Sequence, residues 1–539
     1  MTLAPRFLVN FWAGYRVAGF MRRIRAAGRG TADQATALAR LMAQLADTAF
    51  AREHGLTAAT TYGQFREKVP PRPPEYFAPL VARMLAGEAG VLAPGRCLFF
   101  VETAGSTGEA PRWLPVPEPM LAHFRRGLRD ALFLYAARAG HAGVFLGRHL
   151  HAGASTELTE DHGSYHTTLD GLLALCLTPW VEANLYAPPA AVSRLPEGAE
   201  KIAATVRAML PCDVTLVGGA PGSVWALAQA ACKAAATDRR RPAHLQAVWP
   251  NLECFAFTGA PLGLHHEPLR AVLGPNVAFH EFYAAAEGVF AAQDVAGPAG
   301  LRLLTDAGVF YEFLPLQEFS EATLAGAGDR CLPLGQVQPG IDYVLLVTTP
   351  AGLCRYVVGD IVRFLTVDPP RLQFVGRTRL QLNSLGEQLR ERDLVEAVQA
   401  VCARNGWQAV SFHVAPYQER IAAGRNLQCH EWWLELHTHT NKTPMASVLG
   451  TEFDAELALR HPAYAALRNS RTLGSPQVRL VMPGVFSQWA AEQSRTASLS
   501  KMPRCRSDRL IANQLAALTR FHRPSITPFA SAGGSIPPA

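Results

Sequence analysis

Apolar segments of strand length that alternate with helix-length stretches are the feature that most constrains the fold of this chain. Three such segments, rich in β-branched and aromatic residues, end in small polar residues at 213–222, 254–260 and 277–288. A helix-like stretch, 223–235, separates the first two. Strands separated by helices predict an α/β layer in which ligand-binding groups gather at the carboxyl ends of the strands.

Length and composition set the class of protein. A chain of 539 residues is too long for one compact core and predicts two or three domains. Its net charge of +7 comes mostly from arginines spread along the chain, without the basic, aromatic-containing patches typical of nucleic-acid binding, so we expect no nucleic-acid partner. Ten cysteines occur singly, without a CxxC pair, and predict reduced, mostly buried thiols in a cytoplasmic protein.

The N-terminal segment 7–20 is apolar but is interrupted by Asn10 and Arg16, and its charges follow rather than precede it. This order argues against a cleaved signal peptide, and the segment is short for a membrane-spanning helix. We expect a helix packed on the main domain and no membrane partner. A helix lying on a membrane surface is the alternative that the flanking arginines leave open.

Other periodic segments predict the domain organisation. Helical patterns cover 31–50, 80–86 and 120–137. Beyond residue 300 the chain predicts short strands at 343–349, 353–356, 361–365 and 372–375, then a helix at 391–404 and strands at 411–414 and 432–437. We therefore predict a large N-terminal domain, 1–376, with α/β layers and a β-rich subdomain, joined through a hinge, 377–386, to a smaller, mobile α+β domain, 387–524. The remaining 525–539, rich in Ser, Pro, Gly and Ala, is predicted to be a disordered tail.

An apolar run at 98–101 stops abruptly in a loop of Gly, Ser and Thr that is followed by Arg112. Glycines let the backbone approach an anion closely, while successive N–H groups and hydroxyls donate to it. The loop is therefore typical of phosphate binding, with Arg112 supplying positive charge. An ordinary turn is the alternative, because the loop matches neither the GxxxxGK[ST] nor the GxGxxG pattern.

Two carboxylates are candidates for chemistry. Glu287 lies in an almost wholly apolar run, where an ionised carboxylate is costly unless it is paired or binds a metal, although Gly288 also allows a surface turn. Asp360 follows a glycine in a predicted turn, which it could cap, or it could accept both hydroxyls of a ribose. Four histidines lie close together in sequence, but their spacing does not favour a metal site: His149, His151, His162 and His166.

Together these motifs resemble the GH3 family of acyl-acid amido synthetases, which are related to acyl-adenylating enzymes such as acyl-CoA ligases and luciferase. Five stretches carry the resemblance, in the family's order. Segment 103–108 is similar to the phosphate loop, 283–288 to the YxxxEG motif, 355–360 to the RYxxGD motif, 374–386 to the FVGR hinge and 501–504 to the KxPR segment. The resemblance extends over roughly residues 30–515.

The resemblance implies an ATP-dependent ligase that converts a carboxylic acid to an acyl-adenylate and passes the acyl group to the amine of an amino acid or another amine. It implies Mg²⁺ as cofactor, bound by Glu287, with Lys501 and Arg112 as further catalytic groups. Tyr283 would pack on the adenine, and Lys501 would stabilise the adenylation transition state. The implied nucleotide-binding residues are Thr103, Gly105, Ser106, Thr107, Gly108, Tyr283, Asp360 and Arg377. The C-terminal domain is expected to swing about the hinge between the two half-reactions.

Three positions depart from the family pattern and bear on the balance of the half-reactions: Ala286 in place of Ser, Arg379 in place of an acidic hinge residue, and Gln388 in place of Lys. Two alternatives stay open. A thiol such as coenzyme A could accept the acyl group, or the chain could bind nucleotide without catalysis. The acid pocket is expected among the helices after Met120 and residues 150–180, but no motif identifies the acid, the acceptor or the oligomeric state.

Overall fold

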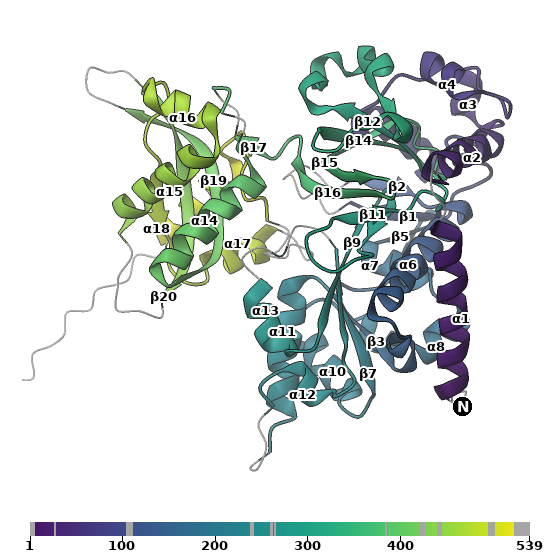
Figure 1. Cartoon of the computed structure of the whole chain (residues 1–539), viewed down its shortest axis with the longest axis horizontal. Coiled ribbons are helices and arrows are strands. Elements are labelled where there is room, and N and C mark those ends of the chain that lie inside the picture. The colour runs from purple at the N-terminus through teal and green to yellow at the C-terminus, as the bar shows by residue number, and fades with distance from the viewer. Residues whose placement is uncertain are drawn as a thin grey trace, which may run out of the picture.

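The structure is a computed structural model of the chain (Figure 1). It describes residues 6–25, 29–103, 112–237, 242–258, 262, 266–382, 385–387, 389–420, 426–438, 445–493 and 502–521. The predicted tail, 525–539, lies outside the described residues.

Twelve strands of the described chain form one twisted sheet that joins the predicted α/β layer to the predicted β-rich region. The parallel part contains β6 (Tyr186–Ala187), β3 (Arg148–Ala152), β7 (Val214–Gly219), β8 (Cys254–Phe257) and β9 (Ala278–Ala285). The antiparallel part continues with β10 (Gly288–Ala292), β11 (Leu301–Leu303), β16 (Pro370–Arg377), β15 (Tyr356–Val367), β14 (Asp342–Thr348), β12 (Phe310–Pro315) and β13 (Leu332–Pro333). Strand β9 belongs to both parts, since it runs parallel to β8 and antiparallel to β10.

Helices cover both faces of the parallel strands because successive side chains point to opposite faces. Val217 and Phe255 pack in a core with α10 (Ala199–Met209), α11 (Pro221–Ala234), α12 (Leu245–Val248) and α13 (His266–Leu273). Their neighbours Leu216 and Cys254 face the opposite way, toward α6 (Glu118–Ala139). The buried layer predicted from the alternation of strands and helices is confirmed.

A second, four-stranded sheet holds the start of the predicted phosphate loop. Its order is β2 (Trp113–Pro115), β1 (Phe99–Glu102), β5 (Ser164–Thr167) and β4 (Thr159–Asp161). β1 confirms the predicted strand, and it pairs antiparallel with β2, so Thr103 and Arg112 stand opposite each other at the base of the intervening loop. The loop residues 104–111 lie outside the described residues.

The N-terminal helices pack around these sheets. They are α1 (Arg6–Ile24), α2 (Arg29–Leu45), α3 (Ala49–Glu53), α4 (Tyr62–Lys68) and α5 (Pro74–Leu85). The predicted helix 31–50 is two helices, because the Thr48 side chain caps a new helix by accepting from the Ala51 amide. Helix α1 buries Val17 and Phe20 against the main domain, as expected. Among the described helices, none is both long and apolar enough to cross a membrane.

Two predictions for the β-rich region are wrong. Residues 353–355 are not a strand, and Asp360 is not in a turn between strands but inside β15. Strand β15 is hydrogen-bonded on both sides, to β14 and β16, which overrides the local turn signal. Gly359 adopts a φ of 88° where the register with β14 shifts, so the glycine permits a bulge rather than a turn.

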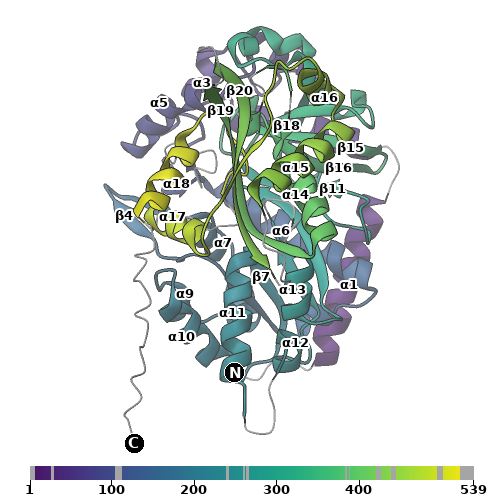
Figure 2. The same cartoon turned by 90° about the vertical axis from the view of Figure 1, so that its left-hand side faces the viewer.

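The C-terminal part has its own sheet and cores, as predicted for a separate α+β unit (Figure 2). Strands β19 (Trp407–Arg420), β20 (Asn426–Thr438) and β21 (Gln477–Leu480) form the sheet. One face packs on α14 (Glu391–Asn405), α15 (Ala446–Arg460) and α16 (Pro462–Asn469), and the other on α17 (Val485–Gln493) and α18 (Leu510–Phe521). The short hairpin β17 (Gln381–Leu382) and β18 (Leu389–Arg390) precedes it.

Candidate active site

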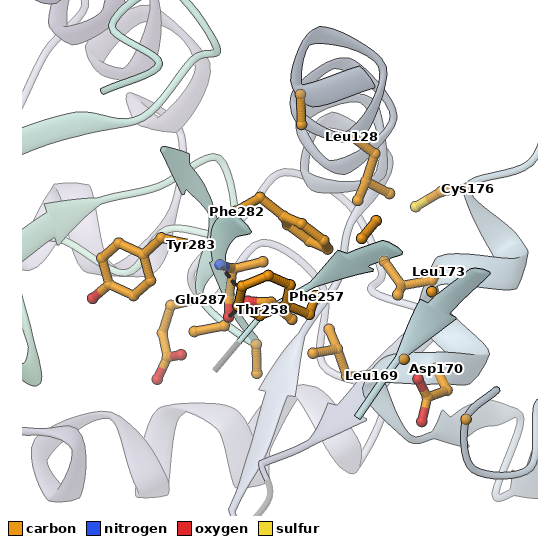
Figure 3. A pocket seen from close by; sticks show the side chains of 18 of the residues that line it. Leu128, Leu169, Asp170, Leu173, Cys176, Phe257, Thr258, Phe282, Tyr283 and Glu287 are labelled. Carbon is orange, nitrogen blue, oxygen red and sulfur yellow. Dashed lines mark hydrogen bonds between the residues drawn. The ribbon is translucent and has the colours of Figure 1, made fainter. Parts of the chain in front are cut away.

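A cavity of about 1310 Å³ opens at the carboxyl ends of β3, β7, β8 and β9 (Figure 3). Six of the residues predicted to bind nucleotide or metal line it together: Thr103, Arg112, Tyr283, Glu287, Asp360 and Arg377. They come from both sheets and from segments more than 250 residues apart, and the fold brings them to one place. The other predicted residues lie outside the described residues: Gly105, Ser106, Thr107, Gly108 and Lys501.

Glu287 occupies a two-residue turn between β9 and β10, with Ala285 paired to Gly288. The turn is therefore real, but it is not on the surface, because Glu287 is only 8% exposed and lines the cavity. Gly288 has a φ of 151°, and a Cβ there would lie 2.8 Å from His123 Nε2. Glycine thus allows the turn to pack directly on a buried histidine.

His123, on α6, fixes the position of this turn and was not identified from the sequence. Its Nε2 accepts a hydrogen bond from the Val289 amide at 2.9 Å. Since Nε2 is the acceptor, Nδ1 carries the proton and donates to the Ala307 carbonyl at 2.8 Å. Burial lowers the pKa of His123 to about 4, so the ring stays neutral and keeps this arrangement. Its place among apolar residues of a predicted helix gave no sign of the role.

The environment of Glu287 fits a cation ligand. Burial raises the pKa of Glu287, the negative charge of Asp360 raises it further, and Arg112 opposes both. Within the described residues, its one side-chain hydrogen bond comes from the Tyr356 hydroxyl, at 3.2 Å. The carboxylate thus keeps acceptor capacity toward the cavity. The described residues contain no group of three or more His, Cys, Asp or Glu side chains arranged to hold a metal. This donor set suits Mg²⁺, which commonly binds one or two carboxylates and completes its shell with phosphates and water.

Asp360 lies at the centre of a hydrogen-bonded cluster in the same cavity. The Tyr283 hydroxyl donates to one carboxylate oxygen at 2.5 Å, and Arg377 Nε donates to the other at 3.1 Å. Asp360 is 4% exposed. Burial raises the pKa of Tyr283 well above its ordinary value, and the charge of Asp360 adds to the effect, so the phenol remains a donor. The ring of Tyr283 packs edge-on against Phe290 and Phe374.

Glu75 on α5 links the loop base to the predicted hinge. Arg112 donates to its carboxylate at 3.2 Å and Arg379 at 3.0 Å. Arg379 also donates to Glu321 at 2.8 Å. The departure from an acidic residue at position 379 therefore places a cation between two glutamates. Glu75 was not identified from the sequence, because an acidic residue in the first turn of a helix is common at protein surfaces.

The segment that follows Lys501 reaches the cavity from the C-terminal part. Met502 and Pro503 line the cavity, and Arg504 is buried. The Arg504 guanidinium donates to the Ser411 hydroxyl at 2.7 Å, and its backbone N–H donates to Glu391 at 3.0 Å. The segment is thus fixed to β19 and α14 beside the cavity.

Family models match three successive parts of the chain: the GH3 family N-terminal domain at 25–166, the central domain at 302–377 and the C-terminal domain at 392–510. Together they match more than half of the chain. The chain belongs to the GH3 family. The resemblance carried by the five motifs is therefore confirmed.

Curated GH3 relatives match part of the chain. Indole-3-acetic acid-amido synthetase GH3.8 from Oryza sativa subsp. indica is 28% identical over 209 residues, 36% of this chain and 33% of the relative. GH3.4 from Arabidopsis thaliana, also an indole-3-acetic acid-amido synthetase, is 25% identical over 208 residues, 36% of this chain and 34% of the relative. The chain thus matches about a third of the length of these two relatives.

Solved structures share the fold over nearly the whole GH3 chain. The structure of AtGH3.15 acyl acid amido synthetase in complex with 2,4-DB gives a TM-score of 0.73 at 17% identity and covers 96% of this chain and 97% of that one. A 2-hydroxyisobutyryl-CoA ligase in the postadenylation state gives 0.53 at 13% identity, covering 93% and 91%. The predicted fold class, a large N-terminal part with a smaller C-terminal one, is confirmed.

Proposed function

We propose that this GH3 chain is an ATP-dependent ligase that adenylates a carboxylic acid and transfers the acyl group to the amine of an amino acid. The observation that carries the proposal is the convergence of Glu287 and the Tyr283–Asp360–Arg377 cluster on one cavity. At about 1310 Å³ the cavity exceeds the size usual for one small ligand, so a nucleotide and an acid fit together. The amido synthetase activity named for the relatives agrees with this chemistry.

In the first half-reaction a carboxylate oxygen attacks the α-phosphorus of ATP, and the bond to pyrophosphate breaks. Asp360 would accept the ribose hydroxyls with the lone pairs that Tyr283 and Arg377 leave available. Arg112 would offset phosphate charge. Glu287 would hold Mg²⁺, and that ion, when bound, stabilises the charge that develops on the phosphates.

In the second half-reaction the amine nitrogen attacks the acyl carbonyl carbon, the bond to AMP breaks, and the nitrogen loses a proton. The adenylate must be kept from water until the amine arrives. We propose that the C-terminal part, 387–524, turns about 377–386 between the two steps, with Arg379 leaving Glu75 and Glu321 in the process. The ten free cysteines support a cytoplasmic location for this reaction.

The test is pyrophosphate release from purified protein with ATP and Mg²⁺, across aromatic, fatty and hydroxylated acids, with mixed amino acids or coenzyme A. Release with an acid alone establishes adenylation, and the mass of the product identifies the acceptor. If the product is a thioester and not an amide, the acceptor is a thiol and not an amine. Nucleotide binding without pyrophosphate release from any acid would leave a non-catalytic protein.

Lys501→Ala tests whether Lys501 acts in adenylation and not in amide formation. We expect loss of adenylation with little loss of amide formation from preformed acyl-adenylate, because the lysine is proposed to stabilise only the first transition state. Stopped assays of the two half-reactions measure both rates. Lys233→Ala, at an exposed position of α11, is the matched control and should leave both rates unchanged. Equal loss of both steps in Lys501→Ala would contradict a step-specific role.

A further inference from the structure

One arm of the cavity leads away from Glu287 and is lined by apolar side chains. Figure 3 shows Glu287 and Tyr283 on one side of the cavity. On the other side are Leu173 of α7 (Leu169–Leu175) and Cys176, the residue after that helix, and Phe282 lies between the two sides. Leu128, from α6, lies on the same far side. The arm therefore begins where an acid must meet the nucleotide and continues into an apolar environment.

The arm reaches the surface between α1 and α8 (Pro179–Asn184), which lie side by side in Figure 1. Leu8 and Trp12 of α1 line the cavity together with Trp180 of α8. The rings of Trp12 and Trp180 are 6.4 Å apart between centroids, and they are 54% and 45% exposed. We call Leu8, Trp12 and Trp180 the aromatic rim.

Several charged and polar side chains along this arm are paired within the protein, and Arg16, at its surface end, lies with its guanidinium carbon 5.4 Å from the centroid of the Trp12 ring. His151 Nε2 and Asp170 Oδ1 are 2.7 Å apart, and the Ala154 amide donates to the other Asp170 oxygen at 2.9 Å. Arg129 donates to Asp130 at 2.8 Å, and Arg126 donates to Asp306 at 2.6 Å. A ligand in the arm is therefore held mainly by apolar contact, since these side chains already have partners.

We propose that the acid substrate has an elongated, unbranched apolar chain, of the fatty-acid class. Its carboxylate would lie at the nucleotide end, and its tail would pass between α6 and α7 to the aromatic rim. A compact acid would leave the apolar arm beyond it unused, whereas each methylene that enters gains affinity of about fourfold. The inference rests on the proposed ligase function, for which it names the substrate class.

The first experiment is a chain-length series of saturated acids from butanoic to hexadecanoic, read by pyrophosphate release with ATP and Mg²⁺. We expect kcat/KM to rise by about fourfold per methylene and to level off once the tail reaches the rim, where it meets water. Benzoic acid serves as the compact comparison. A series that does not rise with length, with benzoic acid preferred, would overturn the inference.

Matched variants locate the tail. Trp12→Ala, at the rim, should lower the ratio of dodecanoic to butanoic acid turnover about tenfold, because the chain loses its last apolar contact. Phe11→Ala is the control: Phe11 is the neighbouring residue on α1, is 75% exposed and is not among the cavity-lining residues of the described chain. It should leave the ratio unchanged. Leu173→Trp should fill the middle of the arm and lower the ratio more strongly than Trp12→Ala.

Calorimetric binding of dodecanoic acid without ATP separates this inference from the ligase proposal. Binding that Leu173→Trp abolishes, without pyrophosphate release from any acid, would support the apolar arm and contradict the ligase. Release from compact acids without binding or turnover of dodecanoic acid would support the ligase and overturn the apolar-tail inference. Circular dichroism confirms that Leu173→Trp is folded, and a wild-type protein that neither binds nor activates the long acid overturns the inference in any case.

Discussion

Two buried glutamates of the N-terminal part show how one chemical group serves two purposes. Glu312 lies in β12 and Glu287 in the turn between β9 and β10, and burial raises the pKa of both. Their partners are adjacent in the chain. Arg355 pairs with Glu312, and Tyr356 donates to Glu287. Arg355 directly precedes β15 and Tyr356 is its first residue, so consecutive side chains reach one glutamate in the core and one at the cavity.

The hydrogen bonds of the Glu312–Arg355 pair in the core are made by the protein itself. Arg355 Nε and the Tyr62 hydroxyl donate to Glu312 at 2.9 and 3.0 Å. Arg355 also donates to the carbonyl oxygens of Arg66, Val69 and Gly328. Glu287, in contrast, faces a cavity and a second carboxylate, Asp360. Burial and a raised pKa therefore do not distinguish a carboxylate that stabilises the fold from one that binds a ligand. The distinction is whether the protein satisfies the carboxylate or leaves it for a ligand.

The largest expected effect is on the core pair. Glu312→Gln should lower the free energy of unfolding by about 3–5 kcal/mol, because it leaves the buried Arg355 charge without its counter-ion. Urea unfolding measures the loss. The folded fraction should keep its adenylation rate. The double variant Glu312→Leu/Arg355→Met should recover only part of the stability, since three carbonyls lose their donor. Full stability in Glu312→Gln would remove the contrast with Glu287.

Glu287→Ala should have the reverse profile. We expect adenylation to fall by two to three orders of magnitude, about 3–4 kcal/mol, the scale for one preorganised electrostatic group. Stability should change little, because the loss of the hydrogen bond from Tyr356 is offset by the removal of a carboxyl group that is costly to bury. Pyrophosphate release and thermal unfolding are the two measurements. A wild-type rate would contradict the magnesium assignment, and unfolding at the level of Glu312→Gln would make the two carboxylates equivalent.

Parts of the fold and of the site could be predicted from local sequence, whereas the role of Glu312 and other features could not. The strand alternation predicted the α/β layer because periodicity is a local signal. The turn at Asp360 was predicted wrongly, since pairing on both sides of β15 depends on strands far away in sequence. Glu287 and Asp360 are candidates from their residue types and motifs, and the fold brings them to one cavity. The hydrogen bond from Tyr283 to Asp360 was not predicted, because it joins positions 77 residues apart.

Residues that act through packing gave the weakest signals. His123 supports the Glu287 turn from a helix that looks like ordinary core, and Glu75 joins Arg112 to Arg379 from the first turn of a helix. From the sequence, Arg355 stands out only as part of a motif. Its guanidinium donates to Glu312 and to three carbonyl oxygens, all from segments distant in sequence, and these contacts hold it in the core.

Tyr283→Phe is expected to have a smaller effect and tests the cluster that accompanies Glu287. The variant removes a 2.5 Å hydrogen bond to the Asp360 carboxylate and should raise KM for ATP by about 10- to 100-fold, corresponding to about 1.5–3 kcal/mol. Steady-state adenylation kinetics measure the change. Tyr311→Phe is the matched control, because that buried hydroxyl donates only to the Leu304 carbonyl within the described core. A KM unchanged in Tyr283→Phe would mean that Asp360 holds the ribose without orientation by the phenol.

The smallest expected effect is the pH dependence that Glu287, in contrast to Glu312, gives to adenylation. Burial raises the pKa of Glu287 above its ordinary value of 4.5, and the charge of Asp360 raises it further. Adenylation requires the carboxylate and should therefore fall by up to about tenfold per pH unit, or about 1.4 kcal/mol, as pH decreases through this raised pKa.

The stability of the fold should change with pH in the opposite direction. Between the ordinary pKa of 4.5 and the raised pKa, Glu287 holds a proton in the native state that it has lost in the unfolded state, so stability falls as pH rises. Urea unfolding of wild type and Glu287→Gln across this range measures the difference, which isolates Glu287 because Glu312 is present in both. The variant should lose that part of the slope. Identical slopes of stability against pH in the wild type and in Glu287→Gln would mean that another group takes up the proton. Glu287 would then be satisfied by the protein in the same way as Glu312.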